Sequence, residues 1–143
     1  MDITRSALVL HSAAEMYRLV LDVPHYPLFL NWCSAAQVIE QSPELQVASL
    51  EVSIGGLRHA FTTSNRLVPT EAIFLSLKQG PFSRLSGHWT FQQLGDAGSK
   101  VTLHLAFDFS NTLLSSAFRS GFARVADRLV EDFSRRADVV YRP

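Results

Sequence analysis

The hydrophobic residues near the end of the chain recur at steps of three and four, which places side chains along one face of an α-helix. Asn111 is a candidate N-cap, because its carboxamide can accept from the free N–H groups of a first turn, and no proline follows until Pro143. The pattern predicts one long helix over residues 111–141, whose apolar stripe needs a partner of similar length. The stripe consists of Leu114, Phe118, Phe122, Val125, Leu129, Phe133, Ala137 and Val140.

The start of the chain predicts a strand, a capped helix and an aromatic arm. We expect the strand over residues 3–10. Ser12 and Glu15 have the spacing of a capping box, so a helix should run from there to about residue 22. Two prolines then interrupt the chain and leave a short helical turn or an irregular arm, residues 26–33, that is rich in aromatic side chains.

Between these regions, apolar and polar residues alternate in segments separated by turn residues, which is typical of β-strands. A two-residue turn at Gly55-Gly56 sets Leu50 opposite Phe61. The apolar faces agree from hairpin to hairpin, so the pattern predicts one antiparallel sheet with a single buried face that covers the helical stripe. This is an α+β fold. The strands expected here span residues 37–41, 45–54, 57–68, 72–79, 82–94 and 100–110.

Length and charge narrow the class of protein. A chain of 143 residues is expected to form a single domain, residues 1–143, with a sizeable core. Lys+Arg and Asp+Glu both number 13, which argues against a general nucleic-acid binder and against a DNA-binding role. Six arginines nevertheless crowd the end of the chain among four acidic residues, either as a solvated, salt-bridged face or as a partner-binding surface. They are Arg119, Arg124, Arg128, Arg135, Arg136 and Arg142. Glu131 with Arg135, and Asp132 with Arg136, have the i,i+4 spacing of ion pairs on a helix.

The compartment is expected to be the cytoplasm. Cys33 is the only cysteine, which excludes an internal disulfide and fits a reducing environment. The first residues show neither a signal peptide nor a transit segment, and no apolar run approaches the ~20 residues needed to cross a bilayer. Any membrane contact is therefore expected to be peripheral, at the inner membrane.

One strand carries polar residues on its buried side. The face of the 57–68 strand that presents Phe61 also presents His59, Thr63 and Asn65. Polar groups in a dry core cost free energy unless they are paired. Either these side chains lie near the sheet edge and bond to their neighbours, or the curved sheet and the straight helix enclose a mostly apolar cavity that binds a small molecule.

The sequence offers little for catalysis. It contains no Gly-x-Ser-x-Gly elbow, no phosphate-binding loop and no evident acid–base carboxylate pair. His88 and His104 should face each other across the last hairpin, but a metal site needs more ligands. Cys33, beside Trp32 and small residues, is interpreted as a small buried hydrophobe. We therefore predict no catalytic residue, no metal and no required cofactor.

Four segments resemble a known family. They are Asp22-Val23-x-x-Tyr26-Pro27-x-Phe29-Leu30-x-Trp32-Cys33, Gly80-Pro81-Phe82-x-x-Leu85-x-Gly87-x-Trp89-x-Phe91, Phe107-x-Phe109-x-Asn111-x-Leu113 and Phe133-x-x-Arg136-Ala137-x-x-Val140-Tyr141. In this order they are similar to the START-like coenzyme Q-binding proteins, polyketide cyclase-like members of the SRPBCC superfamily whose bacterial representatives include a ribosome-association toxin. Asn31 departs from the pattern, since the family usually has proline there.

The resemblance implies a helix-grip fold, in which a seven-stranded antiparallel sheet wraps around the long C-terminal helix. It also implies a hydrophobic tunnel, used in the superfamily for lipids and polyketides and in this branch for ubiquinone. It does not imply catalysis. The residues that would line the tunnel are Phe61, Leu75, Leu77, Trp89, Leu103, Leu105, Phe122, Val125 and Phe133, and His59, Thr63 and Asn65 are the candidate hydrogen-bonding partners of the quinone carbonyls. A lid or membrane-touching rim, or simply a plug at the end of the sheet, would come from Tyr26, Phe29, Leu30, Trp32, Pro81 and Phe82.

We therefore predict a non-catalytic carrier or chaperone of a hydrophobic ligand, a ubiquinone-type polyprenyl quinone or a lipid, that supports respiration. A first alternative is a protein that docks on the large ribosomal subunit and blocks subunit association, with Arg124, Arg128 and Arg135 as the contact. A second alternative is a polyketide cyclase or aromatase, which would need His59 as a base in the tunnel.

Overall fold

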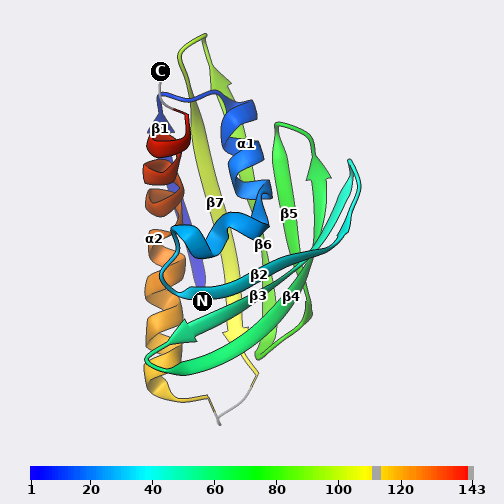
Figure 1. Cartoon of the computed structure of the whole chain (residues 1–143), viewed down its shortest axis with the longest axis vertical. Coiled ribbons are helices and arrows are strands. Elements are labelled where there is room, and N and C mark those ends of the chain that lie inside the picture. Colours follow the sequence, from blue (N-terminus) through cyan, green and yellow to red (C-terminus); the bar gives the residue numbers. More distant parts are fainter. Residues whose placement is uncertain (111–113, 142–143) are drawn as a thin grey trace.

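The computed structural model describes residues 1–110 and 114–141 as one curved antiparallel sheet with a long helix across its open side (Figure 1). The strand order is β1-β7-β6-β5-β4-β3-β2. The elements, in chain order, are β1 (Asp2–Val9), α1 (Ala13–Leu21), the 3₁₀ helix η1 (Val23–Leu28), β2 (Cys33–Gln41), β3 (Leu45–Ile54), β4 (Leu57–Val68), β5 (Ala72–Gln79), β6 (Phe82–Leu94), β7 (Gly98–Phe109) and α2 (Ser116–Val140).

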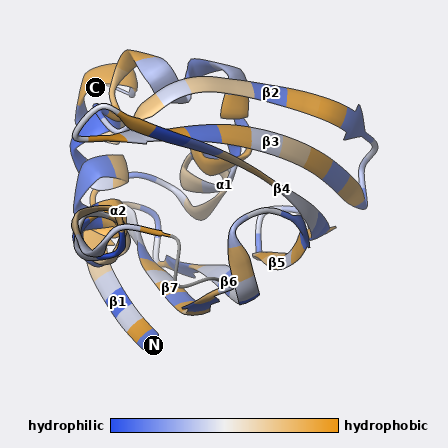
Figure 2. Ribbon diagram, turned by 90° about the horizontal axis from the view of Figure 1, so that it is seen from below, coloured by the Kyte–Doolittle hydropathy of each residue, from blue (hydrophilic) through white to orange (hydrophobic). Residues whose placement is uncertain are grey.

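The sheet bends so strongly that its two edges approach each other. Seen along the strands, β2 and β3 lie opposite β6 and β7, and α2 lies between the two edges (Figure 2). Irregular pairing in β2, β4 and β6 accompanies this curvature, since bulges bend a strand and increase its twist. The α+β class and the helix-grip arrangement expected from the sequence are confirmed.

The strand registers follow the turns as predicted. Leu50 lies opposite Phe61 in the β3–β4 pair, and His88 lies opposite His104 in the β6–β7 pair. The pairing of β2 with β3 starts at Cys33, so β2 begins four residues before the predicted residue 37. The alternation pattern missed this part because small and polar residues open the strand and an irregularity follows Cys33.

The capping box at the start of α1 is confirmed. The Ser12 N–H donates to Glu15 Oε1 at 2.9 Å, and the Glu15 N–H donates to Ser12 Oγ at 3.1 Å. Two orphan backbone donors at the helix start are thereby satisfied. Tyr17, Leu19 and Val20 are buried, and α1 packs against the sheet beside α2.

The predicted start of the long helix was wrong. α2 begins at Ser116, and its N-cap is Ser115, whose Oγ accepts from the Phe118 N–H at 3.1 Å. Leu114 is buried but precedes the helix, so the apolar spacing continues into the preceding loop. Asn111, the predicted cap, lies outside the described residues. Val140 at the other end of the stripe is exposed.

Aromatic rings dominate the core between the sheet and α2. Phe107, Phe118 and Phe133 are almost fully buried, and Phe122 lies 5.1 Å from Phe107 between ring centroids. In the part of the chain that the structure describes, no helix is both long enough and apolar enough to span a bilayer.

Candidate functional site

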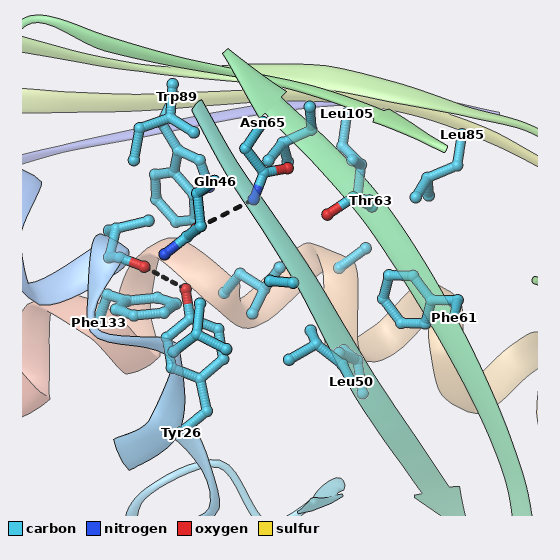
Figure 3. Close-up of a pocket in the computed structure, with 18 of the residues that line it drawn as sticks. Tyr26, Gln46, Leu50, Phe61, Thr63, Asn65, Leu85, Trp89, Leu105 and Phe133 are labelled. Carbon is cyan, nitrogen blue, oxygen red and sulfur yellow. Dashed lines mark hydrogen bonds between the residues drawn. The ribbon is translucent and has the colours of Figure 1, made fainter. Parts of the chain in front are cut away.

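The sheet and α2 do not close completely on each other. A cavity of about 100 Å³ remains between them, covered on one side by α1 and η1 (Figure 3). Its walls are mostly apolar, with Gln46, Thr63 and Asn65 as the polar side chains of the sheet. The curvature of the sheet therefore creates a candidate ligand site close to where the sequence predicted one.

The structure brings nine of the predicted ligand-binding residues to this cavity. They are Phe61, Thr63, Asn65, Leu75, Trp89, Leu105, Phe122, Val125 and Phe133. On β4, the alternation that put Phe61, Thr63 and Asn65 on one face is the reason that all three point inward.

Three predicted lining residues do not reach the cavity. His59 lies near the β3–β4 hairpin, where its ring packs edge-on against Phe118 at 4.5 Å. Leu77 is only half-buried and lies toward the end of β5, and Leu103 is 1% exposed within packed core. His59 lies beyond Phe61 toward the hairpin, whereas Leu77 and Leu103 pair with the lining residues Thr63 and Trp89. A shared sheet face and a matching register therefore do not by themselves bring a side chain to the cavity.

Sequence reasoning missed much of the lining. On β3, Gln46, Ala48 and Leu50 alternate along one face and all line the cavity. The predicted register contained the signal, since the turn that sets Leu50 opposite Phe61 also sets Gln46 opposite Asn65. The other residues missed are Val20, Val23, Ile73, Leu85, Ala126 and Leu129.

The aromatic arm closes the cavity. Tyr26 and Trp32 line it, whereas Phe29, Leu30, Pro81 and Phe82 do not. Tyr26, Leu30 and Phe82 are all buried, so these side chains are not a membrane-touching rim in this structure.

The packing of the arm supports the plug interpretation. The ring centroid of Tyr26 lies 5.3 Å from that of Phe133. Phe82 packs against the rings of Phe61, Phe109 and Phe122 at centroid distances of 5.5, 5.5 and 5.0 Å. These contacts fill the space between the arm, β6 and α2.

Two glutamines and an asparagine form a hydrogen-bonded chain at one wall of the cavity. Gln46 Nε2 donates to the Leu21 carbonyl oxygen at 2.8 Å and to Gln41 Oε1 at 3.1 Å. Gln46 Oε1 accepts from Asn65 Nδ2 at 3.1 Å (Figure 3). Within the described residues, two buried polar atoms of the lining have no hydrogen-bond partner, Asn65 Oδ1 and Trp32 Nε1. Two residues of the lining therefore carry a buried polar atom without a protein partner, an acceptor on Asn65 and a donor on Trp32.

Comparison with known proteins identifies the family. The family model described as polyketide cyclase / dehydrase and lipid transport matches residues 9–134. The chain belongs to this family. The expectation from the sequence segments is therefore confirmed.

Relatives and solved structures agree with the family. The chain is 46% identical over 140 residues to the ribosome association toxin RatA of Vibrio cholerae, covering 98% of this chain and 97% of that protein. It is 26% identical over 135 residues to the mitochondrial coenzyme Q-binding protein COQ10 homolog B of Xenopus laevis, covering 91% of this chain and 55% of that protein.

Among solved structures, the Zhui aromatase/cyclase from Streptomyces sp. R1128 superposes with a TM-score of 0.85 at 16% identity, covering 99% of this chain and 96% of that one. A START superfamily protein from Mycobacterium smegmatis gives a TM-score of 0.78 at 19% identity, covering 97% and 98%. These two likenesses bear on the fold alone.

The second alternative from the sequence, a polyketide cyclase, requires a catalytic base in the cavity. His59, the histidine expected to serve, lies outside the lining. Cys33 is 3% exposed, and burial raises the pKa of its thiol to about 11, which keeps it protonated and unreactive. His88 and His104 face each other at 5.4 Å, but no group of three or more potential metal ligands occurs in the described residues.

The arginines of α2 are in several different environments. Arg135 pairs with Glu131 at 2.6 Å, as the i,i+4 spacing predicted. Arg136 instead lies over the ring of Phe29 at 5.1 Å, so its expected pair with Asp132 does not form. Arg124 and Arg128 are exposed and, among the described residues, neither has a carboxylate within salt-bridge distance. The helix face is therefore only partly neutralised by its own acidic residues.

Proposed function

We propose that this protein is a non-catalytic binding protein that holds the ring of a hydrophobic small molecule, such as the head of a polyprenyl quinone, in the cavity between the sheet and α2. The observation that carries this proposal is an apolar, largely covered cavity whose wall contains an unpaired buried acceptor and an unpaired buried donor. Such a combination is typical of small-molecule sites. A distant relative bears the name of a coenzyme Q-binding protein.

The size of the cavity limits what it holds. About 100 Å³ is less than the 300–1,000 Å³ of sites for drug-sized ligands and resembles engineered cavities, about 150 Å³, that take benzene. The structure therefore has room for about one small ring or a few methylene groups. This cavity is smaller than the tunnel that the family resemblance implied, so a polyprenyl tail would require lining side chains to move.

Both tryptophans of the chain, Trp32 and Trp89, line the cavity, which gives a direct assay. We expect a ubiquinone analogue with a short alkyl tail to quench their fluorescence saturably. N-acetyltryptophanamide, titrated in parallel, corrects for collisional quenching and light absorption by the quinone. Quenching no stronger than that of the free amide would remove the proposal. Solvent extraction and mass spectrometry of the purified protein would then identify a natural ligand.

A second function is favoured by a separate observation. The 46% identity to a ribosome association toxin extends over nearly the whole of both chains. We propose on this basis that the protein also binds the large ribosomal subunit in the cytoplasm, with the exposed, unneutralised Arg124 and Arg128 of α2 contacting RNA phosphates. Arginine forms bidentate hydrogen bonds with phosphate, and such contacts weaken as salt rises.

Sedimentation tests this second proposal. The protein should travel with purified large subunits in a sucrose gradient at 50 mM salt and less so at 200 mM. The double variant Arg124→Glu/Arg128→Glu should lose most of this association. Arg66→Glu/Lys78→Glu, which makes the same change in net charge on β4 and β5, should retain it. Equal loss in both double variants would mean that net charge, rather than this face of α2, is responsible.

A further inference from the structure

The amide of Asn65 has its orientation fixed by a chain of hydrogen bonds that begins at a backbone carbonyl. The Leu21 carbonyl oxygen can only accept, so the Gln46 amide must present its nitrogen to it, at 2.8 Å. The Gln46 oxygen then faces Asn65 and must accept, which requires the nitrogen of Asn65 at 3.1 Å. The oxygen of Asn65 is consequently turned away from Gln46.

This oxygen is an acceptor without a donor. Asn65 is 4% exposed, and no donor from the part of the chain that the structure describes reaches its Oδ1. Figure 3 shows the oxygen on the side away from Gln46, with the hydroxyl of Thr63 turned toward the same space and Leu105 nearby. A buried carbonyl that is left unpaired destabilises the folded protein. Its place in a mostly apolar wall indicates that a ligand supplies the donor.

We propose that the cavity selects a ring bearing a hydroxyl donor, a phenol or a hydroquinone, over the same ring bearing only carbonyl or methyl groups. This inference rests on the proposed role of the cavity as a ligand site and specifies which chemistry it recognises. A hydroxyl O–H donates to Asn65 Oδ1, whereas a quinone carbonyl would place two acceptors against each other. The Trp32 N–H is the other buried polar atom of the lining that has no partner among the described residues. For a quinone-type ligand, the reduced form should therefore bind more tightly than the oxidised form, which still binds through its apolar ring.

Phenol and toluene form a matched pair of probes, because they have nearly the same size and differ in the hydroxyl. Their dissociation constants can be measured by NMR from the indole N–H signals of Trp32 and Trp89, which also report that binding occurs in the cavity. Because toluene is the more hydrophobic probe, the quantity to compare is the ratio of the toluene to the phenol dissociation constant. Asn65→Leu should lower this ratio roughly fivefold to tenfold, the effect of one hydrogen bond.

Asn65→Leu leaves the Gln46 oxygen without its donor, so a second variant is needed. Gln46→Leu/Asn65→Leu removes the pair together and should lower the ratio by a similar factor. If both probes bind and the ratio is the same in wild type and variants, the hydroxyl preference is overturned while the cavity remains a ligand site. If neither probe shifts the indole signals of the wild-type protein, both proposals are overturned. If neither variant folds, a wild-type preference for toluene overturns the inference and a preference for phenol supports it.

Discussion

Cys33 shows how the fold controls the chemistry of a single side chain. The residue is 3% exposed, its Sγ donates to the Ala35 carbonyl oxygen at 3.4 Å, and burial raises the pKa of the thiol to about 11. The thiolate is the reactive species. At pH 8 we expect iodoacetamide to alkylate the native protein on the order of 10² times more slowly than the urea-unfolded protein. Equal rates, measured by mass spectrometry, would show that the thiol is accessible.

The Tyr26 hydroxyl replaces a backbone hydrogen bond that a proline cannot make. The Val20 carbonyl oxygen would ordinarily accept from the N–H four residues later, but Pro24 has none. The buried Tyr26 hydroxyl donates to this oxygen instead. Tyr26→Phe should therefore lower the free energy of unfolding by about 1–3 kcal/mol, because a buried carbonyl loses its donor. Tyr17→Phe is the control, since the Tyr17 hydroxyl makes no hydrogen bond within the described residues and its loss should change stability by less than about 0.5 kcal/mol.

The same tyrosine makes stability depend on alkaline pH. Burial raises the pKa of Tyr26 well above its ordinary value near 10. In the unfolded chain the Tyr26 hydroxyl ionises near pH 10, whereas in the folded protein it keeps its proton. The contribution of Tyr26 to stability is therefore fully present below pH 10 and is lost as the pH rises above it. Above pH 10, the free energy of unfolding of wild type should fall more steeply than that of Tyr26→Phe, by about 1.4 kcal/mol per pH unit. The free energies of unfolding of the two proteins can be measured by urea denaturation at pH 9, 10 and 11. An equal fall with pH in both proteins would contradict this account.

Among the elements, α2 depends on its N-cap as well as on its apolar stripe. Ser115 Oγ accepts from the Phe118 N–H, whereas the Ser116 side chain is exposed and makes no hydrogen bond within the described chain. Ser115→Ala should lower the free energy of unfolding by about 1 kcal/mol. Ser116→Ala should change it by less than about 0.5 kcal/mol. Equal losses in urea denaturation would mean that the hydroxyl of Ser115 does not cap the helix.

Local signals explain which elements were predictable. The capping box and the two-residue turn at Gly55-Gly56 are short-range features, and both fixed their elements correctly. The start of α2 was misplaced because apolar spacing cannot distinguish Leu114, a buried loop residue, from a first helical turn. Ser115 carried the missing information.

The candidate site was predictable only in part for a related reason. Alternation and register give the face of each strand, which brought Phe61, Thr63 and Asn65 to the cavity and would have brought Gln46. They do not give the curvature of the sheet or how far each side chain reaches, so they could not show that His59 lies beyond the cavity or that Leu77, opposite the lining residue Thr63, does not reach it. The cavity is also smaller than the tunnel that the family resemblance implied.

At the scale of the whole molecule, α2 serves both proposed functions. Its inner face closes the cavity with Phe122, Val125 and Ala126, while Arg124 and Arg128 are exposed. The two proposals therefore depend on different residues of one helix, and a rigid helix also offers a physical connection between them. Substitutions on each face can show whether the functions are independent.

Ala126→Leu tests this independence by changing the cavity-facing side of α2. Ala126 is 1% exposed and lines the cavity, so a leucine there should occupy much of the roughly 100 Å³. We expect it to abolish saturable quenching by the quinone analogue and to leave co-sedimentation with the large ribosomal subunit unchanged. Ala117→Leu, an exposed position on the same helix, controls for the added side chain and should change neither measurement. Overpacking could cost about 1–3 kcal/mol, which urea denaturation would reveal.

Arg124→Glu/Arg128→Glu should give the opposite result, with sedimentation lost and quenching retained, because neither arginine lines the cavity. If Ala126→Leu folds with near wild-type stability and nevertheless loses the ribosomal subunit, the two functions are coupled, and occupancy of the cavity must alter the surface of α2. The reciprocal measurement then decides the matter, since a coupling free energy acts equally in both directions. Addition of the large subunit would have to change the affinity of wild-type protein for the quinone analogue by the same factor as the analogue changes its affinity for the large subunit.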